Sequence, residues 1–592
     1  MTQRETHKET QSNPDDHGAV GLEPSTTQAS HSNSTTDRRS FLKFGAMGGA
    51  AVAAATTTPG ALANQSPDAS AVVAPKSLSQ GRNNRRARSA LLLKGVAAEQ
   101  HYKTTMAAGK QPTNGDERRY RNDNYYASFT KTLPSNDYGE VDPGAFEALA
   151  RATKRGRPDL FDAIPLDPSA ARKLANPQGA WKFEPFALDG WGTRMPAAHT
   201  FRSPEIAAEM VEVYWQACTR DVPFIDYGSN SDIADAVSDL NAMSAPPAGG
   251  VTTGTLFRGE TPGDAIGPYI SQFLVVPFNF GPAANVQRYS VPTAGINFMV
   301  DVPNWLNVQR GGAPAENLVF DSTPRYIYNN RALGEYVHSD VLYQAYLNAC
   351  LILLSKGPGA IDPGNPYLAD ITNQGAFTSL GGPMILDMVT KAANLSLNGA
   401  WFQKWNMHRY LRPEAYAGRV NFHRAGQRSY ELHPDVLNSQ IVAKVFSIYG
   451  NCLLPMAYTE GSPTHPSYPA GHATIAGACC TVLKAFFNED YVFDAPVQAD
   501  ATGLSLLPYV GPDLTVGGEL NKLANNIAIG RDAAGVHYRQ DGIYGLDTGE
   551  QQAIALLQDY SRTLNEGNFD GFTLTKFDGQ KIRIRNGNIL PA

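Results

Sequence analysis

Residues 469–487 read Pro-Ala-Gly-His-Ala-Thr-Ile-Ala-Gly-Ala-Cys-Cys-Thr-Val-Leu-Lys-Ala-Phe-Phe, a glycine-led helix start followed by an apolar run. A proline before the start suits the first turn of a helix, and the apolar run predicts a helix buried in a core. Free backbone N–H groups at such a start attract an anion, and Gly471 lets a ligand approach the backbone closely. This stretch therefore predicts a buried helix whose first turn faces a negatively charged group.

A second stretch, Lys404-Trp-Asn-Met-His-Arg-Tyr-Leu-Arg412-Pro413, supplies two cations. The residues before it, from Met384 onward, have the amphipathic pattern of a helix that extends to Trp405. Pro413 opposes continuation of that helix and biases Arg412 towards extended backbone, which helps the two long side chains to converge. A lysine point charge and an arginine fork can together neutralise a multiply charged anion.

The third stretch, Arg531-Asp-Ala-Ala-Gly-Val-His537, adds an arginine and an imidazole, with Asp541 four residues further on. A separation of six residues does not place Arg531 and His537 on one helix face, so we predict a turn at Arg531-Asp532 with Asp532 as a candidate N-cap. Asp541 would hold the His537 ring in one tautomer. Together the three stretches suit a tetrahedral or trigonal-bipyramidal oxyanion such as phosphate or vanadate.

In this order and spacing the motifs resemble those of the vanadium-dependent haloperoxidases of the bromoperoxidase type. This branch belongs to a superfamily that also holds the type 2 phosphatidic-acid phosphatases and bacterial acid phosphatases. The likeness runs from about Phe201 to about Leu557. The interval from Lys404 to Arg412 resembles algal and cyanobacterial bromoperoxidases, because the phosphatases and chloroperoxidases usually have one residue fewer. His465 also resembles this branch, where other branches often have an aromatic residue.

The resemblance implies which residues hold a vanadate cofactor. His537 would bond the vanadium through an imidazole nitrogen at an apical position. The equatorial oxygens would pair with the side chains of Lys404, Arg412 and Arg531 and with the backbone N–H of Gly471. His472 would hydrogen-bond the other apical oxygen of the cofactor and act as acid and base for peroxide entry. Lys404 would polarise the bound peroxide.

Further residues would act around these ligands. The resemblance implies that His465 influences halide oxidation and that Trp401 lies where halide preference is tuned, while Asp541 supports His537. Ala470 departs from the family, which commonly has serine at this position. A serine hydroxyl there would donate a hydrogen bond worth about 1.5–3 kcal/mol to a charged acceptor. Because Ala470 lacks this hydroxyl, the affinity for vanadate is expected to differ from that of relatives.

The expected activity is oxidation of bromide and iodide by hydrogen peroxide to a hypohalous-acid equivalent that halogenates small organic molecules. Two alternatives remain open. An exported acid phosphatase would use His537 as a phosphoryl nucleophile, although His465, the Lys404 to Arg412 spacing and the size of the chain oppose it. A non-enzymatic anion-binding protein is favoured only by Ala470. Neither the preferred halide nor the organic substrate follows from the sequence.

The N-terminal 63 residues predict an exported protein. Residues 1–37 are polar and have the composition of a disordered leader. Arg38-Arg39-Ser-Phe-Leu-Lys43 then opens a weakly hydrophobic run that ends in Ala61-Leu-Ala63, the pattern of a twin-arginine signal cleaved before Asn64. We therefore expect a periplasmic or extracellular protein. No other apolar run has the length of a membrane span.

Composition excludes several other classes of protein. The 50 basic residues are outnumbered by 56 acidic ones, which argues against nucleic acid or an anionic membrane surface as a partner. Five cysteines in 592 residues do not make a disulfide framework, and no Cys/His spacing resembles a zinc site.

For the fold we predict a mainly α protein, with helical bundles around the oxyanion site and a few short β-hairpins. Residues 64–200 would form an arm that wraps the core or a neighbouring subunit, and residues 201–592 the catalytic domain. Helices are expected from Ser203-Pro204 through Cys218 and near residues 339–354. Residues 572–585 alternate around Asp578-Gly579, which indicates a hairpin.

Two predictions concern further partners. Asp362 and Asp370, with Asn365 and Asn373, form an oxygen-rich segment that is a candidate calcium site, although ordinary turns use the same residues. The resemblance also implies a homodimer or a larger homo-oligomer.

Overall fold

The computed structural model describes residues 111–592 together with positions 88, 92, 95, 96 and 99. The predicted disordered leader and twin-arginine signal lie outside these described residues. Of the predicted arm, residues 111–200 are described, and most of residues 64–110 are not. Residues 111–592 belong to one compact unit. In the described part of the chain, no helix is both long enough and apolar enough to cross a membrane.

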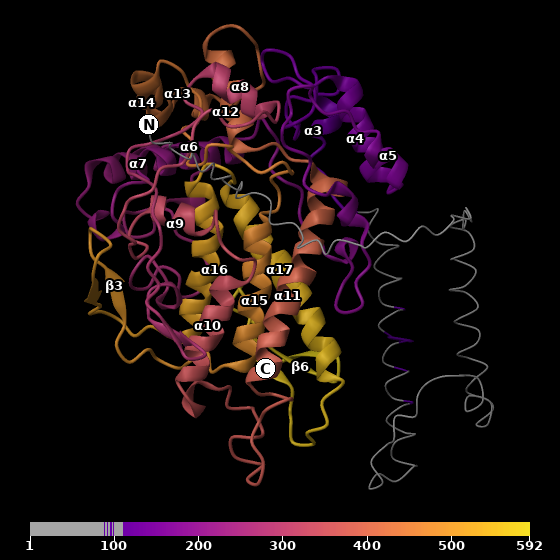
Figure 1. The fold of residues 1–592 in the computed structure, drawn as a ribbon, viewed down its shortest axis with the longest axis vertical. Helices are drawn as coiled ribbons and strands as arrows, with labels where there is room; N and C mark the ends of the chain where they lie inside the picture. The colour runs from indigo at the N-terminus through magenta and orange to yellow at the C-terminus, as the bar shows by residue number, and fades with distance from the viewer. Residues whose placement is uncertain (1–87, 89–91, 93–94, 97–98, 100–110) are drawn as a thin grey trace, which may run out of the picture. The chain divides into compact units, whose positions relative to one another are not determined.

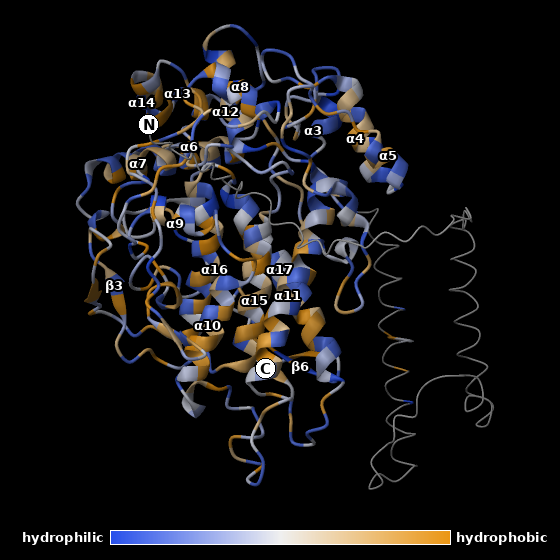
Figure 2. Cartoon of the chain, in the orientation of Figure 1, coloured by the Kyte–Doolittle hydropathy of each residue, from blue (hydrophilic) through white to orange (hydrophobic). Residues whose placement is uncertain are grey.

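Long helices make up the centre of the molecule, and the prediction of a mainly α fold is confirmed (Figure 1). The four central helices are α11 (Gly382–Phe402), α15 (Gly471–Phe486), α16 (Val516–Ala533) and α17 (Arg539–Ser561). Helix α15 contacts each of the other three and is buried along almost its whole length. Many residues of these helices are hydrophobic (Figure 2), and most of those are buried.

Two glycines allow α15 and α17 to pack with their backbones almost in contact. A Cβ on Gly549 of α17 would lie 2.0 Å from the Thr474 carbonyl oxygen, and one on Gly477 of α15 would lie 2.2 Å from the Leu546 carbonyl oxygen. Neither position therefore has room for a side chain. The close approach brings the start of α15 next to the start of α17, where two of the predicted site motifs lie.

Further helices surround this centre, and two of them test the sequence predictions. Helix α6 (Pro204–Cys218) begins as predicted, with the Ser203 hydroxyl accepting a hydrogen bond from the Ile206 N–H at 3.4 Å. Helix α10 (Gln344–Ser355) begins later than predicted, because residues 337–343 form an irregular connection. The others are α3 (Asp116–Arg119), α4 (Pro143–Arg155), α5 (Pro158–Asp162), α7 (Ser231–Asn241), α8 (Val302–Gln309), α9 (Asn330–Tyr336), α12 (Pro413–Arg424), α13 (Pro434–Asn438) and α14 (Gln440–Tyr449).

The β structure consists of small antiparallel sheets at the periphery. The predicted C-terminal hairpin is confirmed, with Phe572 opposite Ile584 and Thr575 opposite Lys581, and a third strand that the sequence did not predict extends it. The strands are β1 (Phe278–Phe280) with β2 (Ala283–Asn285), β3 (Val497–Ala499) with β4 (Leu506–Pro508), and β5 (Phe572–Thr575), β6 (Lys581–Arg585) and β7 (Asn588–Pro591).

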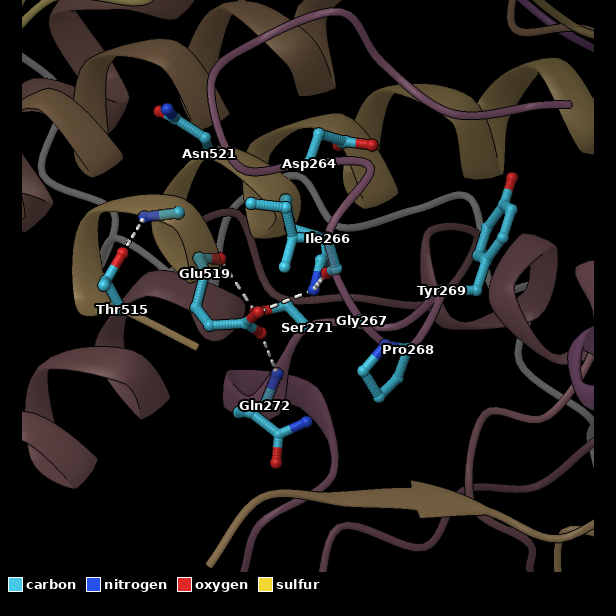
Figure 3. Close-up of polar contacts among 12 residues, drawn as sticks. Asp264, Ile266, Gly267, Pro268, Tyr269, Ser271, Gln272, Thr515, Glu519 and Asn521 are labelled. Carbon is cyan, nitrogen blue, oxygen red and sulfur yellow. Dashed lines mark hydrogen bonds and ion pairs between the residues drawn. The ribbon is translucent and has the colours of Figure 1, made fainter. Parts of the chain in front are cut away.

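A polar loop fixes the first half of α16 (Figure 3). The Glu519 carboxylate accepts a hydrogen bond from the Gln272 N–H at 2.7 Å, and the Ser271 hydroxyl donates to the Glu519 carbonyl at 2.8 Å. Lys522 pairs with the Glu519 carboxylate at 2.6 Å and donates to the Ile266 carbonyl at 2.6 Å. Both charged side chains are almost fully buried. The polar groups of the loop and of the helix pair with one another, and these bonds set the direction of α16.

The described part of the predicted N-terminal arm packs over the segment that carries Lys404. Trp405 belongs to a separate apolar cluster with Phe129 and Phe146, and Arg409 pairs with Glu117 at 2.6 Å. These contacts cover the chain that directly follows Lys404. The division of the protein at residue 200 stays a prediction.

We expect Gly549→Ala to destabilise the protein by about 1–3 kcal/mol or more, because the added methyl forces α15 and α17 apart. Thermal unfolding followed by circular dichroism would measure the effect. Gly375→Ala is the matched control, since a Cβ there meets nothing within 4 Å. Equal unfolding temperatures for both variants would contradict the packing argument.

Candidate functional site

The three sequence stretches meet at one end of the central bundle. Helices α11 and α16 end there, and α12, α15 and α17 begin there. The backbone of the loop at residues 465–470 lies between them and bonds to α17 through the Ala470 N–H, which donates to the Asp541 carbonyl at 2.9 Å. The structure brings together the side chains of Lys404, Arg412, His465, Arg531, His537 and Asp541.

Lys404 projects from a π-helical turn (Gln403–His408) that directly follows α11. Its ammonium donates to the carbonyls of Pro466 and Ser467, both at 2.7 Å, and the residue is 0% exposed. Burial and the neighbouring charges of Arg412 and Arg531 hold the pKa of Lys404 well below its ordinary value, with Asp541 opposing this. A desolvated cation in this setting gains from the arrival of an anion.

Arg412 connects the motifs to one another. It precedes Pro413 with φ −85° and ψ 155°, so the predicted extended backbone is confirmed. Its guanidinium donates to the carbonyls of Val536 and His465 at 2.7 and 3.0 Å and also lies 2.9 Å from ring nitrogens of His537 and His465. Burial lowers the pKa of Arg412 to about 9, with Asp541 opposing and Arg531 adding to the effect.

The tautomer of His537 follows from its two partners. Nε2 lies 2.9 Å from Arg412, which can only donate, and Nδ1 lies 2.7 Å from the Asp541 carboxylate, which accepts. His537 therefore carries its proton on Nδ1 and presents a lone pair on Nε2. Burial and the charges of Arg412, Lys404 and Arg531 hold the pKa of His537 well below its ordinary value, which keeps the ring neutral.

Asp541 has the supporting position predicted for it. Its carboxylate accepts from the Ser467 hydroxyl, from the Tyr538 N–H at 3.2 Å and from His537. Burial raises the pKa of Asp541 to about 7, against the opposing effects of the Ser467 bond and the Lys404 charge. Since Ser467 also offers its carbonyl to Lys404, Asp541 links the imidazole to the loop that holds the lysine.

The predicted turn at Arg531-Asp532 is wrong. Helix α16 continues through Ala533, so Asp532 is a helical residue and not an N-cap. The chain leaves the helix at Gly535, which has φ +87° and whose N–H donates to the Asp532 carbonyl at 2.8 Å. A glycine just past a helix end is the ordinary stop signal, and Gly535 ends α16 where the prediction had placed a helix start at Asp532.

Arg531 has unused hydrogen-bonding capacity. Its guanidinium donates to the Val337 carbonyl at 2.6 Å and lies 3.4 Å from the Tyr458 hydroxyl. The Nε–H is buried and has no hydrogen-bond partner among the described residues. A buried unpaired donor beside Lys404 and Arg412 fits an oxyanion that would complete its bonding.

The start of α15 also fits an oxyanion. Ala470 is its N-cap and provides no side-chain bond to the first turn. A Cβ on Gly471 would make only ordinary contacts, at 3.5 Å to Leu397 and 3.6 Å to Trp401, so packing within the protein does not require glycine here. Space for a ligand against the backbone N–H explains this glycine better than packing does.

Both of the remaining predicted histidines have partners that orient them. The half-buried His472 bonds through Nε2 to the Asp340 carboxylate at 3.0 Å. The His465 ring lies 4.8 Å from the Trp401 ring, centroid to centroid, and Trp401 donates to the Ala175 carbonyl at 3.2 Å. Burial and the charges of Lys404 and Arg412 hold the pKa of His465 well below its ordinary value.

Sequence reasoning missed several contributors to this site. Asp340, Tyr458 and the Val337 carbonyl come from segments with no motif, and nothing in the sequence places them here. Ser467 lies two residues after His465, and no role was expected for it from the sequence. These residues orient the predicted ones, so their contribution depends on tertiary contacts.

The candidate calcium segment lies between α10 and α11. Burial raises the pKa of Asp362 to about 6, and its carboxylate accepts from the Gly364 N–H at 2.8 Å. Asn365 donates to the Leu380 carbonyl at 3.0 Å. Over the described residues, no group of three or more His, Cys, Asp or Glu side chains is arranged to hold a metal ion. Calcium at Asp362 and Asp370 stays a prediction.

Known proteins resemble this chain in sequence and in fold. The family described as the VCPO second helical-bundle domain matches residues 386–566, which include all three motifs. The vanadium-dependent bromoperoxidase of Corallina pilulifera is 36% identical over 571 residues, covering 80% of this chain and 94% of that protein. This chain belongs to the vanadium-dependent bromoperoxidases. The resemblance expected from the motifs is therefore confirmed.

Other members of this family agree with that assignment. The vanadium-dependent bromoperoxidase of Ascophyllum nodosum is 36% identical over 489 residues, covering 77% of this chain and 86% of that protein. The homohexameric structure of the second vanadate-dependent bromoperoxidase from the same alga superposes with a TM-score of 0.81 at 29% identity, over 90% of this chain and 97% of that one. The bromoperoxidase fold thus extends over nearly all of the described residues.

Inorganic phosphate should raise the unfolding temperature of the protein, because a tetrahedral anion pairs with three desolvated cations only in the folded state. At a hundred-fold excess over the Kd this linkage contributes about 2.7 kcal/mol. Differential scanning calorimetry with and without phosphate would measure the shift, with chloride at equal ionic strength as the control. No difference between the two salts would contradict the oxyanion site.

Proposed function

We propose that this protein is a vanadate-dependent bromoperoxidase that oxidises bromide, and iodide, with hydrogen peroxide. The product is a hypohalous-acid equivalent that halogenates small organic molecules. The observation that carries the proposal is the convergence of Lys404, Arg412 and Arg531 around the Nε2 lone pair of His537, in a chain that belongs to this family.

The residues present fit vanadate. His537 would bind the metal through Nε2, and the three cations with the Gly471 N–H would neutralise its oxygens. When bound, vanadate supplies a Lewis acid that activates hydrogen peroxide without a change in oxidation state. Lys404, Arg412 and His537 are at most 1% exposed, so water is excluded and their charges act at low dielectric.

In this proposal His472 and His465 have separate roles in the reaction. Asp340 holds Nε2 of His472, which leaves Nδ1 to take a proton from hydrogen peroxide and return it later. His465 stays neutral beside Arg412 and lies against Trp401, and in this proposal it influences the oxidation of the halide from that position. Trp401 supplies a polarisable face next to that ring.

The acid phosphatase alternative is not favoured, because the curated relatives that cover most of the chain are bromoperoxidases. The anion-binding alternative still requires an experiment. Bromination of a phenolic dye with bromide and hydrogen peroxide, before and after loading with orthovanadate, distinguishes the three. Activity that appears with vanadate and declines with phosphate supports the proposal, phosphate-ester hydrolysis alone supports a phosphatase, and neither reaction leaves an anion-binding protein.

We propose three further properties: export, assembly into a homo-oligomer and binding of calcium. Export by the twin-arginine route rests on Arg38-Arg39 and the run that follows. A homo-oligomer is supported by the homohexameric relative. A structural calcium ion near Asp362 and Asp370 rests on their oxygen-rich segment.

His537→Ala should abolish bromoperoxidase activity, because it removes the only imidazole nitrogen that Arg412 and Asp541 prepare for the metal. The rate of dye bromination at saturating orthovanadate would measure the loss. His433→Ala is the control, since His433 lies at the start of α13 beside Asp435. Substantial activity in His537→Ala would overturn the site assignment.

Ala470→Ser should tighten vanadate binding about ten-fold. The new hydroxyl adds a hydrogen bond to a charged acceptor, worth about 1.5 kcal/mol or more. Equilibrium dialysis of orthovanadate against the variant and the wild type would compare the two Kd values. An unchanged Kd would mean that the pocket has already compensated for the missing serine.

A further inference from the structure

The irregular connection after α9 touches two residues of the site. The Val337 carbonyl accepts the 2.6 Å bond from Arg531, and the Asp340 carboxylate bonds to His472 at 3.0 Å. Both residues lie between the end of α9 at Tyr336 and the start of α10 at Gln344. The position of this short segment therefore decides where a cation and an acid–base group point.

His338 holds this segment in place from within. Its Nδ1 lies 3.1 Å from the Glu335 carboxylate, and its Nε2 lies 2.8 Å from the Glu460 carboxylate. The ring stacks on Tyr458 with centroids 3.8 Å apart and planes inclined by 10°. Both nitrogens face acceptors, so both carry protons and the ring is an imidazolium bridge between α9 and the loop at residues 457–467.

The charges around His338 agree with this state. Burial alone would lower the pKa of His338, but the bonds to Glu335 and Glu460 raise it to about 9. Burial would raise the pKa of Glu460, yet its bond to His338 lowers it to about 2. Between about pH 2 and about pH 9 the ring is therefore charged and faces the ionised Glu460 carboxylate.

Each partner of His338 is itself anchored. The Ser339 hydroxyl donates to Glu335 at 2.9 Å, and the Glu460 carbonyl accepts from Lys131 at 2.9 Å. The Tyr458 hydroxyl donates to the Gly334 carbonyl at 2.6 Å. The imidazolium thus joins two segments that are each anchored, and together with the Tyr458–Gly334 bond it holds them against each other.

Arg531 depends on this bridge more than the other two cations do. The hydrogen bonds that its guanidinium makes with described residues go to Val337 and Tyr458. His338 is the residue after Val337 in the sequence, and its ring stacks on Tyr458. Lys404 and Arg412 instead bond to carbonyls at residues 465–467 and 536, which His338 does not touch.

We propose that His338 is a positioning residue of the bromoperoxidase site. As an imidazolium bridge between Glu335 and Glu460, it fixes Arg531 for the oxyanion and Asp340 for His472. The inference rests on the proposed function, because the ligand it serves is the vanadate bound there. It predicts that His338 acts on vanadate binding through Arg531.

A double-mutant cycle on the full-length protein tests this dependence. His338→Phe keeps a ring to stack on Tyr458 and removes both bonds to carboxylates. We expect it to weaken binding of orthovanadate about 10- to 100-fold, the effect of losing a well-placed charged donor. In an Arg531→Met background the same substitution should have little further effect on the Kd, because the residue through which it acts is gone.

Equilibrium dialysis gives these Kd values without any turnover. A purely structural role for His338 would weaken binding by the same factor in both backgrounds, which would overturn the proposal, as would a wild-type Kd in His338→Phe. His433→Phe is the matched control, because it removes another half-buried histidine beside a carboxylate, at 3.5 Å from Asp435 and outside the site. We expect it to leave the Kd unchanged.

Two provisions keep the outcome decisive. If His338→Phe does not fold, Glu460→Gln retains the size of the side chain and weakens one bond, and it should show a smaller effect with the same non-additivity. If the wild type binds phosphate but does not brominate with vanadate, the proposed function fails. The cycle is then read with inorganic phosphate, where additivity would still overturn the role of His338.

Discussion

The hydrogen bond between the Asp541 carboxylate and Nδ1 of His537 is the interaction on which the site depends. It fixes the tautomer and so turns the Nε2 lone pair towards the cations. The same carboxylate receives the Ser467 hydroxyl, and the Ser467 carbonyl receives Lys404. One buried carboxylate therefore aligns the first turn of α17, the loop before α15 and the lysine that follows α11.

The site holds more positive charge than the protein around it neutralises. Burial lowers the pKa values of both Lys404 and Arg412, and Arg531 retains a buried Nε–H without a partner in the described part of the chain. Burying cations in this way costs stability unless an anion compensates. The same charges that destabilise the site without an anion give an oxyanion its affinity, so binding and stability are linked.

The fold supports this arrangement by fixing helix directions at a distance. Gly477 and Gly549 let α15 and α17 approach until their backbones touch, and the Glu519–Lys522 pair holds the first half of α16 against its loop. Only the ends of these helices carry reacting groups. The packed middle parts of these helices hold the ends at fixed positions relative to one another. A small site at one end of the bundle therefore requires a large helical core.

The sequence by itself determined the residues with chemical roles, because their types and spacing obey local rules. Pro413 forced Arg412 into extended backbone, a glycine-led start preceded the buried helix α15, and Asp578-Gly579 produced the hairpin. Local rules failed at Asp532, where the helix stop at Gly535 prevailed. Only the tertiary structure decided that Asp340 orients His472 and that His338 lies between Glu335 and Glu460. The contacts of His472 with Asp340 and of His338 with Glu460 join residues more than a hundred positions apart, and they form only after the helices have packed.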